Sequence, residues 1–314
     1  MASNPPMRRI LLVSLAALAA ASTARADAGD AWAFAKGALP ADANYVVGIN
    51  IDALRATSLF TDAVSHFVDR LSARQTIDQI KSACAIDVTA AVQGIVIAAG
   101  AASDDGAVYV AGPRLDAKTV GDCMTKFAAQ SAKKPKIGVG GADAQGIVEL
   151  TAEGETSKLY FGFPRKGVMV IAMRPMDKKL LQRWLGGKGA APSSELARAL
   201  AKVAPASAAW GVIAGLKEPI GDPGARVKLG AAQATAAGGK VQIEIRATMV
   251  GAKDAQNGQQ LVQNQIGEMR KDQGTPPEIL RAADTLKTSV TGDELTVTAS
   301  MPDADVAALM KQMQ

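Results

Sequence analysis

The stretch "VQGIVIAAGAASDDGAVYVAGPRLDAKTVGDC", residues 92–123, decides the fold class of this chain. Its runs "VQGIVIAAG" and "AVYVAG" are short, apolar and rich in β-branched residues, which predicts two strands. The link "AASDDG" between them consists of turn-forming residues, so the two strands are expected to form a hairpin. The following segment, "LDAKTVGDCMTKFAAQ", has a helical pattern. A hairpin that leads into a helix is typical of an α+β protein.

Two adjacent carboxylates in this hairpin, Asp104 and Asp105, resemble an acid/base or metal site. The same arrangement recurs without them in "VKLGAAQATAAGGKVQIEIRATM", residues 227–249, which is again followed by a helical segment. Asp105-Gly106 and Gly238-Gly239 can both supply the positive φ that a tight hairpin turn needs. We therefore interpret the aspartates as turn residues and not as catalytic groups.

A third carboxylate, Asp116, belongs to a pattern of strand, proline, aspartate and helix. Its side chain can accept hydrogen bonds from free helix amides and complement the helix dipole. The pattern occurs three times, as Pro113 with Asp116, Pro175 with Asp177, and Pro302 with Asp303. These aspartates are therefore predicted to stand at helix N-termini.

The order of elements suggests two related halves. Residues 27–189 and residues 190–314 each show a strand, a hairpin, helical material, further strands and a closing helix, with "GGKGAAPSS" as the connector. We expect an α+β fold of mostly antiparallel β-hairpins with helices packed on one face, and an internal duplication.

The N-terminus predicts export. Arg8 and Arg9 precede an apolar run that is too short to span a hydrocarbon core, and small residues follow at the cleavage position. We expect residues 1–26 to be a signal peptide, cleaved between Ala26 and Asp27, by the general or the twin-arginine route. The alternative is an uncleaved membrane anchor. The expected location is periplasmic or secreted.

The net charge argues against a nucleic-acid partner. The chain carries a formal charge of +5. Three of its arginines and none of its acidic residues lie in residues 1–26, so 5 − 3 leaves +2 for the mature part. A balance so close to neutral does not point to nucleic acid or to an anionic surface.

Cys84 and Cys123 are the two cysteines of the chain. An even number of cysteines in an oxidising compartment predicts one disulfide bond. The alternative is two buried free thiols. A CxxC motif is absent, which argues against a thiol oxidoreductase.

The sequence gives little support for a catalytic set that depends on histidine. We assign no catalytic residue. His66 is the one histidine, it lies on a predicted helix beside Phe67, and no GxSxG motif surrounds any serine. A hydrolase that uses a serine with a lysine, or carboxylates alone, stays open.

No resident metal or other cofactor is expected. The chain has no HxxH, HExxH or paired CxxC motif, and its glycine-rich segments lack the GxGxxG and phosphate-loop spacings. Met169, Met173 and Met176 could supply thioether ligands for copper, but methionine fills irregular cores readily, so we assign no metal site.

The segment "DKKLLQRWLGGKG", residues 177–189, is the candidate surface-binding helix. Lys178, Lys179 and Arg183 could face anionic lipid while Trp184 enters the interface, which would make a peripheral membrane contact. The favoured alternative is an ordinary amphipathic helix that packs its leucines and Trp184 onto the sheet.

The stretch "LPADANYVVGINIDALRATSLF", residues 39–60, resembles the opening of exported bacterial proteins of unknown function. The resemblance implies a strand that begins an α+β domain, and an exported location. It transfers no catalytic residue.

The expected function is a non-enzymatic binding or interaction role in the cell envelope. Its partner would be an envelope protein or a small apolar ligand, bound in a cleft or on a patch. The alternatives are a carrier of a lipid or other apolar molecule, and a hydrolase built on serine and lysine or on carboxylates.

Overall fold

The computed structural model describes residues 29–55, 57, 60, 74–100, 105–130, 136–153, 158–189, 194–216, 219 and 224–312. The predicted signal peptide with its cleavage site at Ala26 and Asp27 lies outside these residues, as do His66 and Asp104.

The described residues divide into two compact units. The N-terminal unit contains residues 29–51 and 74–194, and the C-terminal unit contains residues 52–60 and 195–312. The short segment after residue 51 therefore belongs to the C-terminal unit, although the sequence placed it in the first half. The physical reason is that Ala53 and Leu54 pack in the apolar core of the C-terminal unit.

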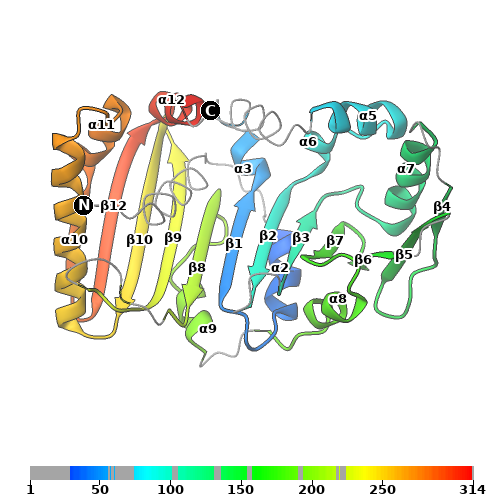
Figure 1. Ribbon diagram of the computed structural model, residues 1–314, viewed down its shortest axis with the longest axis horizontal. Coiled ribbons are helices and arrows are strands. Elements are labelled where there is room, and N and C mark those ends of the chain that lie inside the picture. The colour runs from blue at the N-terminus through cyan, green and yellow to red at the C-terminus, as the bar shows by residue number, and fades with distance from the viewer. Residues whose placement is uncertain are drawn as a thin grey trace. The chain divides into compact units, whose positions relative to one another are not determined.

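The N-terminal unit is an antiparallel sheet with the strand order β1-β2-β3-β7-β6-β5-β4 (Figure 1). Its strands are β1 (Tyr45–Asn50), β2 (Gly94–Ala99), β3 (Gly106–Ala111), β4 (Ile137–Val139), β5 (Ile147–Ala152), β6 (Lys158–Arg165) and β7 (Val168–Ala172). Its helices are α2 (Gly29–Ala38), α5 (Arg74–Cys84), α6 (Val88–Ala91), α7 (Ala117–Gln130) and α8 (Lys178–Leu185).

One face of this sheet is buried beneath helices. Val96, Tyr109 and Val170 are fully buried at opposed positions of β2, β3 and β7. Helix α2 packs on these strands through small side chains such as Ala31 and Ala35, which allow a close approach. Burying apolar surface is worth roughly 25 cal/mol per Å², so this layer of the core holds the helices on the sheet.

The hairpin of β2 and β3 forms as predicted, but Gly106 does not act as a turn residue. It is the first residue of β3, pairs with Ala99, and lacks the positive φ that we expected. A Cβ atom on Gly106 would lie 2.6 Å from the carbonyl oxygen of Ala98 and 2.7 Å from the sulfur of Met173. Glycine is therefore needed here for the close approach of neighbouring groups. In the second hairpin, Gly238 and Gly239 do have positive φ, as predicted.

The predicted disulfide between Cys84 and Cys123 is present and joins α5 to α7. None of the residues of α5 is fully buried, so this helix contributes no side chain to the interior of the core. The disulfide therefore supplies an attachment that packing alone does not.

The C-terminal unit is an antiparallel sheet with the order β11-β12-β10-β9-β8. Its strands are β8 (Ala209–Ala214), β9 (Val227–Ala237), β10 (Lys240–Met249), β11 (Lys287–Thr291) and β12 (Glu294–Pro302). The helices around them are α3 (Ile51–Arg55), α9 (Glu195–Leu200), α10 (Ala252–Lys271), α11 (Pro277–Thr285) and α12 (Asp303–Gln312).

Apolar packing and two ion pairs hold the helices of this unit. The core includes Val241 and Ile243 of β10, Met301 of β12 and Val306 of α12. The Arg281 guanidinium of α11 donates two hydrogen bonds, of 2.9 and 2.7 Å, to the carboxylate of Asp305 in α12. The Arg226 guanidinium likewise donates two hydrogen bonds, both of 3.2 Å, to the carboxylate of Asp254 in α10. Each pair fixes the position and the direction of a helix, because a bidentate contact constrains both.

The two units share one strand topology over five strands, and β5 and β4 extend the sheet of the N-terminal unit further. The first three strands of each unit lie in chain order, and a later hairpin then adds in reverse, as β7-β6 in one unit and β12-β11 in the other. A helix, α7 or α10, follows the first hairpin in both units, and α8 or α12 closes them. An internal duplication would produce this agreement, and the common origin stays a prediction.

Two of the three predicted N-terminal aspartates cap their helices. The Asp116 carboxylate accepts a hydrogen bond from the Thr119 amide (2.8 Å), and Asp177 accepts one from the Leu180 amide (3.0 Å). Asp303 is different, because it is the first residue of α12 and its buried Oδ1 atom has no hydrogen-bond partner. Burial raises the pKa of Asp303. Asp303 therefore stands at a helix N-terminus, as predicted, but the expected capping hydrogen bond was wrong for this residue.

Substitution of Gly187 tests how closely the chain packs after α8. A Cβ atom there would lie 2.0 Å from the carbonyl oxygen of Ala38, so Gly187→Ala should lower the free energy of unfolding by about 1–3 kcal/mol. Gly267→Ala in α10 has open space around it and should raise the free energy of unfolding by about 0.5–1 kcal/mol. Urea denaturation of both variants measures the two effects. A Gly187→Ala protein as stable as the parent would contradict the close contact.

The disulfide should stabilise the chain mainly by restricting its unfolded state. The cysteines are 39 residues apart in sequence, and the loop-entropy estimate for that separation is about 4 kcal/mol. We expect the double variant Cys84→Ser and Cys123→Ser to lose a substantial part of that free energy of unfolding in a denaturation experiment. The parent protein under reducing conditions should lose the same amount. A loss in only one of the two experiments would contradict this explanation.

Candidate functional site

Asp105 connects the first hairpin to helix α8 through its side chain. Its carboxylate forms an ion pair with Arg183 and accepts a hydrogen bond of 3.1 Å from the Trp184 indole nitrogen. Arg183 also donates to Asp42 at 2.6 Å, and this contact lowers the pKa of Asp42. Asp105 therefore has a structural role that the hairpin pattern did not reveal, because its partners lie far away in sequence.

Helix α8 packs on the sheet, as the alternative interpretation of its sequence expected. Trp184 is 0% exposed, and its backbone carbonyl accepts a hydrogen bond of 2.8 Å from the Tyr109 hydroxyl. Arg183 is engaged by Asp105 and Asp42, and Lys178 pairs with Asp143 at 3.0 Å. Lys179, the remaining residue of the candidate surface-binding set, lies on the same helix. Trp184 cannot anchor this helix in a membrane while it is buried in the sheet, so we do not retain that role.

The described residues contain no group of three or more histidine, cysteine, aspartate or glutamate side chains placed to hold a metal ion. Of the methionines considered for copper, Met173 and Met176 lie at the surface. No helix among the described residues is both long and apolar enough to cross a membrane.

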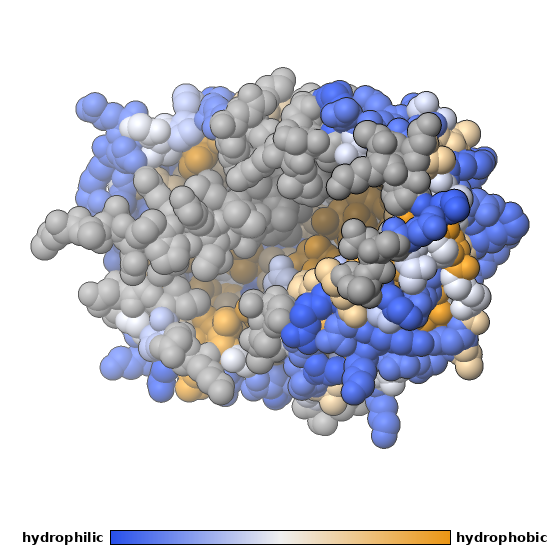
Figure 2. Space-filling model, turned by 45° about the vertical axis from the view of Figure 1, so that its right-hand side comes forward, coloured by the Kyte–Doolittle hydropathy of each residue, from blue (hydrophilic) through white to orange (hydrophobic). Residues whose placement is uncertain are grey.

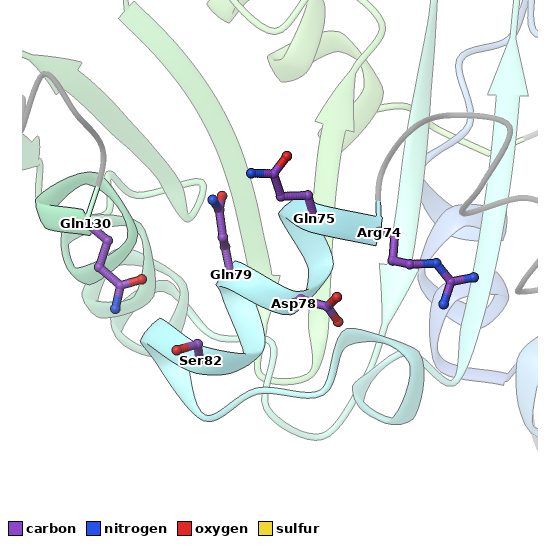
Figure 3. A pocket seen from close by; sticks show the side chains of 6 residues that line it. All are labelled: Arg74, Gln75, Asp78, Gln79, Ser82 and Gln130. Carbon is purple, nitrogen blue, oxygen red and sulfur yellow. The ribbon is translucent and has the colours of Figure 1, made fainter.

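A shallow hollow of about 550 Å³ lies beside α5 in the N-terminal unit. Figure 3 shows Gln75 and Gln79 projecting side by side from α5, whereas Asp78 points to another side of the helix. Ser82, Arg74 and Gln130 complete the lining. In Figure 2, hydrophilic side chains gather along the right-hand edge of the visible face, and apolar ones lie farther in. The side chains that line the hollow are all polar or charged.

A second hollow, of about 420 Å³, lies on the sheet of the C-terminal unit, and we call it the sheet groove. It is built from strands β9, β10, β12 and β11 and from the end of α11. Its lining consists of Gln233, Thr235, Gln242, Ile243, Glu244, Thr285, Lys287, Thr298, Ala299 and Ser300.

Two rows of polar side chains cross the strands in this groove. In the first row Gln233, Glu244, Thr298 and Lys287 stand opposite one another on adjacent strands, and in the second row Thr235, Gln242 and Ser300 do so. Side chains two residues apart on a strand share a face, so both rows point the same way. Neighbouring strands lie about 4.7–4.9 Å apart, which sets the spacing along each row.

Glu244, in the middle of the first row, is hydrogen-bonded to neighbouring side chains of the protein. The Glu244 carboxylate accepts bonds from Gln233 (2.7 Å) and from the Arg246 guanidinium (2.7 and 2.9 Å). The side-chain oxygen of Gln233 in turn accepts the backbone amide of Ala204 at 2.8 Å. The charge of Glu244 is thus neutralised within the protein.

The other polar side chains of the two rows differ from Glu244 and Gln233 in their hydrogen bonding. Within the described part of the chain, the side chains of Lys287, Thr298, Gln242 and Thr235 make no hydrogen bond or ion pair. They offer an ammonium, two hydroxyls and an amide to solvent. At the rim, the Thr285 hydroxyl bonds both backbone groups of Ser300, at 2.7 and 2.9 Å, and so fixes the end of α11 to the sheet.

The corresponding rows of the N-terminal unit are apolar. Counting from the last paired residues of each hairpin, the positions of Thr235, Gln242 and Ser300 correspond to Ile97, Val108 and Ile171. These three side chains are partly buried. The shared topology therefore does not by itself require a polar groove.

No protein-family model matches the chain, and no curated protein matches it. Solved structures that are similar include three crystal forms of TP0453. Forms III, I and IV align with TM-scores of 0.49, 0.48 and 0.48 and with sequence identities of 11%, 13% and 10%. Each alignment covers 88% of this chain, and 97%, 96% and 95% of the respective TP0453 chains.

The role of Asp105 can be tested by truncation. Its side chain is 18% exposed and holds Arg183 and Trp184, so Asp105→Ala should lower the free energy of unfolding by about 2 kcal/mol. Asp122 pairs with Lys118 on the surface, where both side chains are more than half exposed, and Asp122→Ala should cost less than about 1 kcal/mol. Chemical denaturation followed by circular dichroism compares the two. Equal losses would show that Asp105 is not a structural anchor.

Proposed function

We propose that this chain is an exported, non-enzymatic binding module of the cell envelope, and that the sheet groove is its recognition surface. The observation that carries the proposal is the set of unengaged polar side chains at Lys287, Thr298, Gln242 and Thr235 in one hollow. Polar groups that the fold itself leaves without partners can make their hydrogen bonds to a ligand.

The arrangement of reactive groups in the groove supports binding over catalysis. A general base must accept a proton, yet Glu244 is already held by Arg246 and Gln233. A serine nucleophile needs a base within hydrogen-bond reach, and Lys287 does not hydrogen-bond Ser300. These contacts disfavour the hydrolase alternative at this site.

The polarity of the groove disfavours the carrier alternative. An apolar ligand needs a largely apolar wall. Apart from Ile243 and Ala299, the residues that line the groove carry hydroxyl, amide or charged side chains. The disulfide between Cys84 and Cys123 supports export, because such bonds persist in oxidising compartments.

A sedimentation experiment with isolated cell envelopes tests the proposal. The mature chain, exported to a periplasm, is expected to begin at Asp27 and to bind envelopes saturably. A variant with Gln242→Ala and Thr298→Ala should bind about tenfold more weakly, because two of the free hydrogen-bonding side chains are lost.

The matched control replaces two amides in the other hollow, Gln75→Ala and Gln79→Ala, and should bind as the parent does. Absence of saturable binding, or equal binding by the groove variant and the parent, would contradict the proposed function. A denatured mass that retains residues 1–26 would contradict the cleavage and the export.

A further inference from the structure

Resting on the proposed function, we propose that the sheet groove binds an acidic oligosaccharide, that is, a hydroxyl-rich sugar chain that carries carboxylates. Three properties of the groove select this class of ligand: the spacing of its free hydrogen-bonding groups, the absence of apolar anchors, and its unpaired positive charge.

The free groups form a two-dimensional array. Gln242 lies beside Thr235 and Ser300 in one row, and Thr298 lies beside Lys287 in the other. Neighbours along a row are one strand spacing apart, about 4.7–4.9 Å, and the two rows are separated by two residues of extended chain. Sugar hydroxyls both donate and accept, so they can pair with hydroxyl and amide groups in such an array.

The described lining of the groove favours a hydroxyl-rich ligand over a protein partner. Protein interfaces depend on a few buried aromatic, aliphatic or arginine anchors. The apolar residues of the groove are Ile243 and Ala299, and Ile243 is buried in the core on the other face. Ala299 pairs with Ile243 and shares that face, so both contribute only backbone to the groove. A hydroxyl-rich ligand needs no such anchor.

The charge of the groove favours an anionic ligand. Lys287 is exposed and has no ion pair with a described residue, whereas Arg246 is committed to Glu244 at 2.7 Å. Among the described residues, the groove therefore presents Lys287 as an available cation and no available carboxylate. A carboxylate on the sugar chain would complement Lys287, and the contact would weaken as salt is added.

Calorimetric titration of the full mature chain tests the ligand class. The probes are a short oligomer of galacturonic acid and a galactose oligomer of the same length. We expect the acidic oligomer to bind more tightly, and Lys287→Met to weaken its binding about tenfold. The binding of the galactose oligomer should be unchanged by Lys287→Met.

The control variant is Lys253→Met, which removes an exposed lysine on α10 outside the groove and should leave both affinities unchanged. Equal binding of the two oligomers, or equal effects of the two lysine variants, would overturn the proposal. If envelope binding depends on Gln242 and Thr298 while neither oligomer binds, the ligand class is wrong and the proposed function stands. If the parent protein also fails to bind envelopes, both the ligand class and the proposed function are wrong.

Discussion

The antiparallel pairing of β10 with β12 is the constraint on which the C-terminal unit depends. The register from Lys240 opposite Pro302 to Thr248 opposite Glu294 places Val241 and Ile243 on the same face as Met301, where they form the core. The same register places Glu244 opposite Thr298 on the other face. A slip of one residue would exchange the faces of one strand. Because the core strongly specifies the register, it also fixes the geometry of the groove.

The helices on the core face complete the groove from its edge. Arg281 and Asp305 lock α11 to α12, and α12 packs on Met301 and Val241 through Val306. The last residue of α11, Thr285, then bonds both backbone groups of Ser300. The rim of the groove is thus connected to the core by a chain of specific contacts. This arrangement is expected to hold the free side chains in place before a ligand arrives, which lowers the entropic cost of binding.

The sequence predicted the features that are local and could not predict those that join distant segments. The short apolar runs and the links between them were sufficient to predict the hairpins in residues 92–111 and 227–249. A helix start after a strand was sufficient for the caps at Asp116 and Asp177. The pairing of β3 with β7 and of β10 with β12 has no local signal, because other elements lie between the partners. These are α7 and three strands in the first case, and α10, α11 and β11 in the second. The contacts of Asp105 with Arg183 and Trp184 were missed for the same reason. The groove was missed as well, because its rows of side chains can be recognised only when the strand registers are known.

The difference between the two units bears on what the groove is for. Both units follow one topology over five strands. The row that carries Thr235, Gln242 and Ser300 in one unit carries Ile97, Val108 and Ile171 in the other. Solvent exposure alone accounts for polar residues on an open sheet face. The central carboxylate is different, because it is neutralised by its own neighbours within the protein. A buried or half-buried charge is costly unless it is paired, so the Glu244–Arg246 pair makes the centre of the groove stable without a ligand. The free groups around this centre are then available for recognition without being required for the stability of the fold.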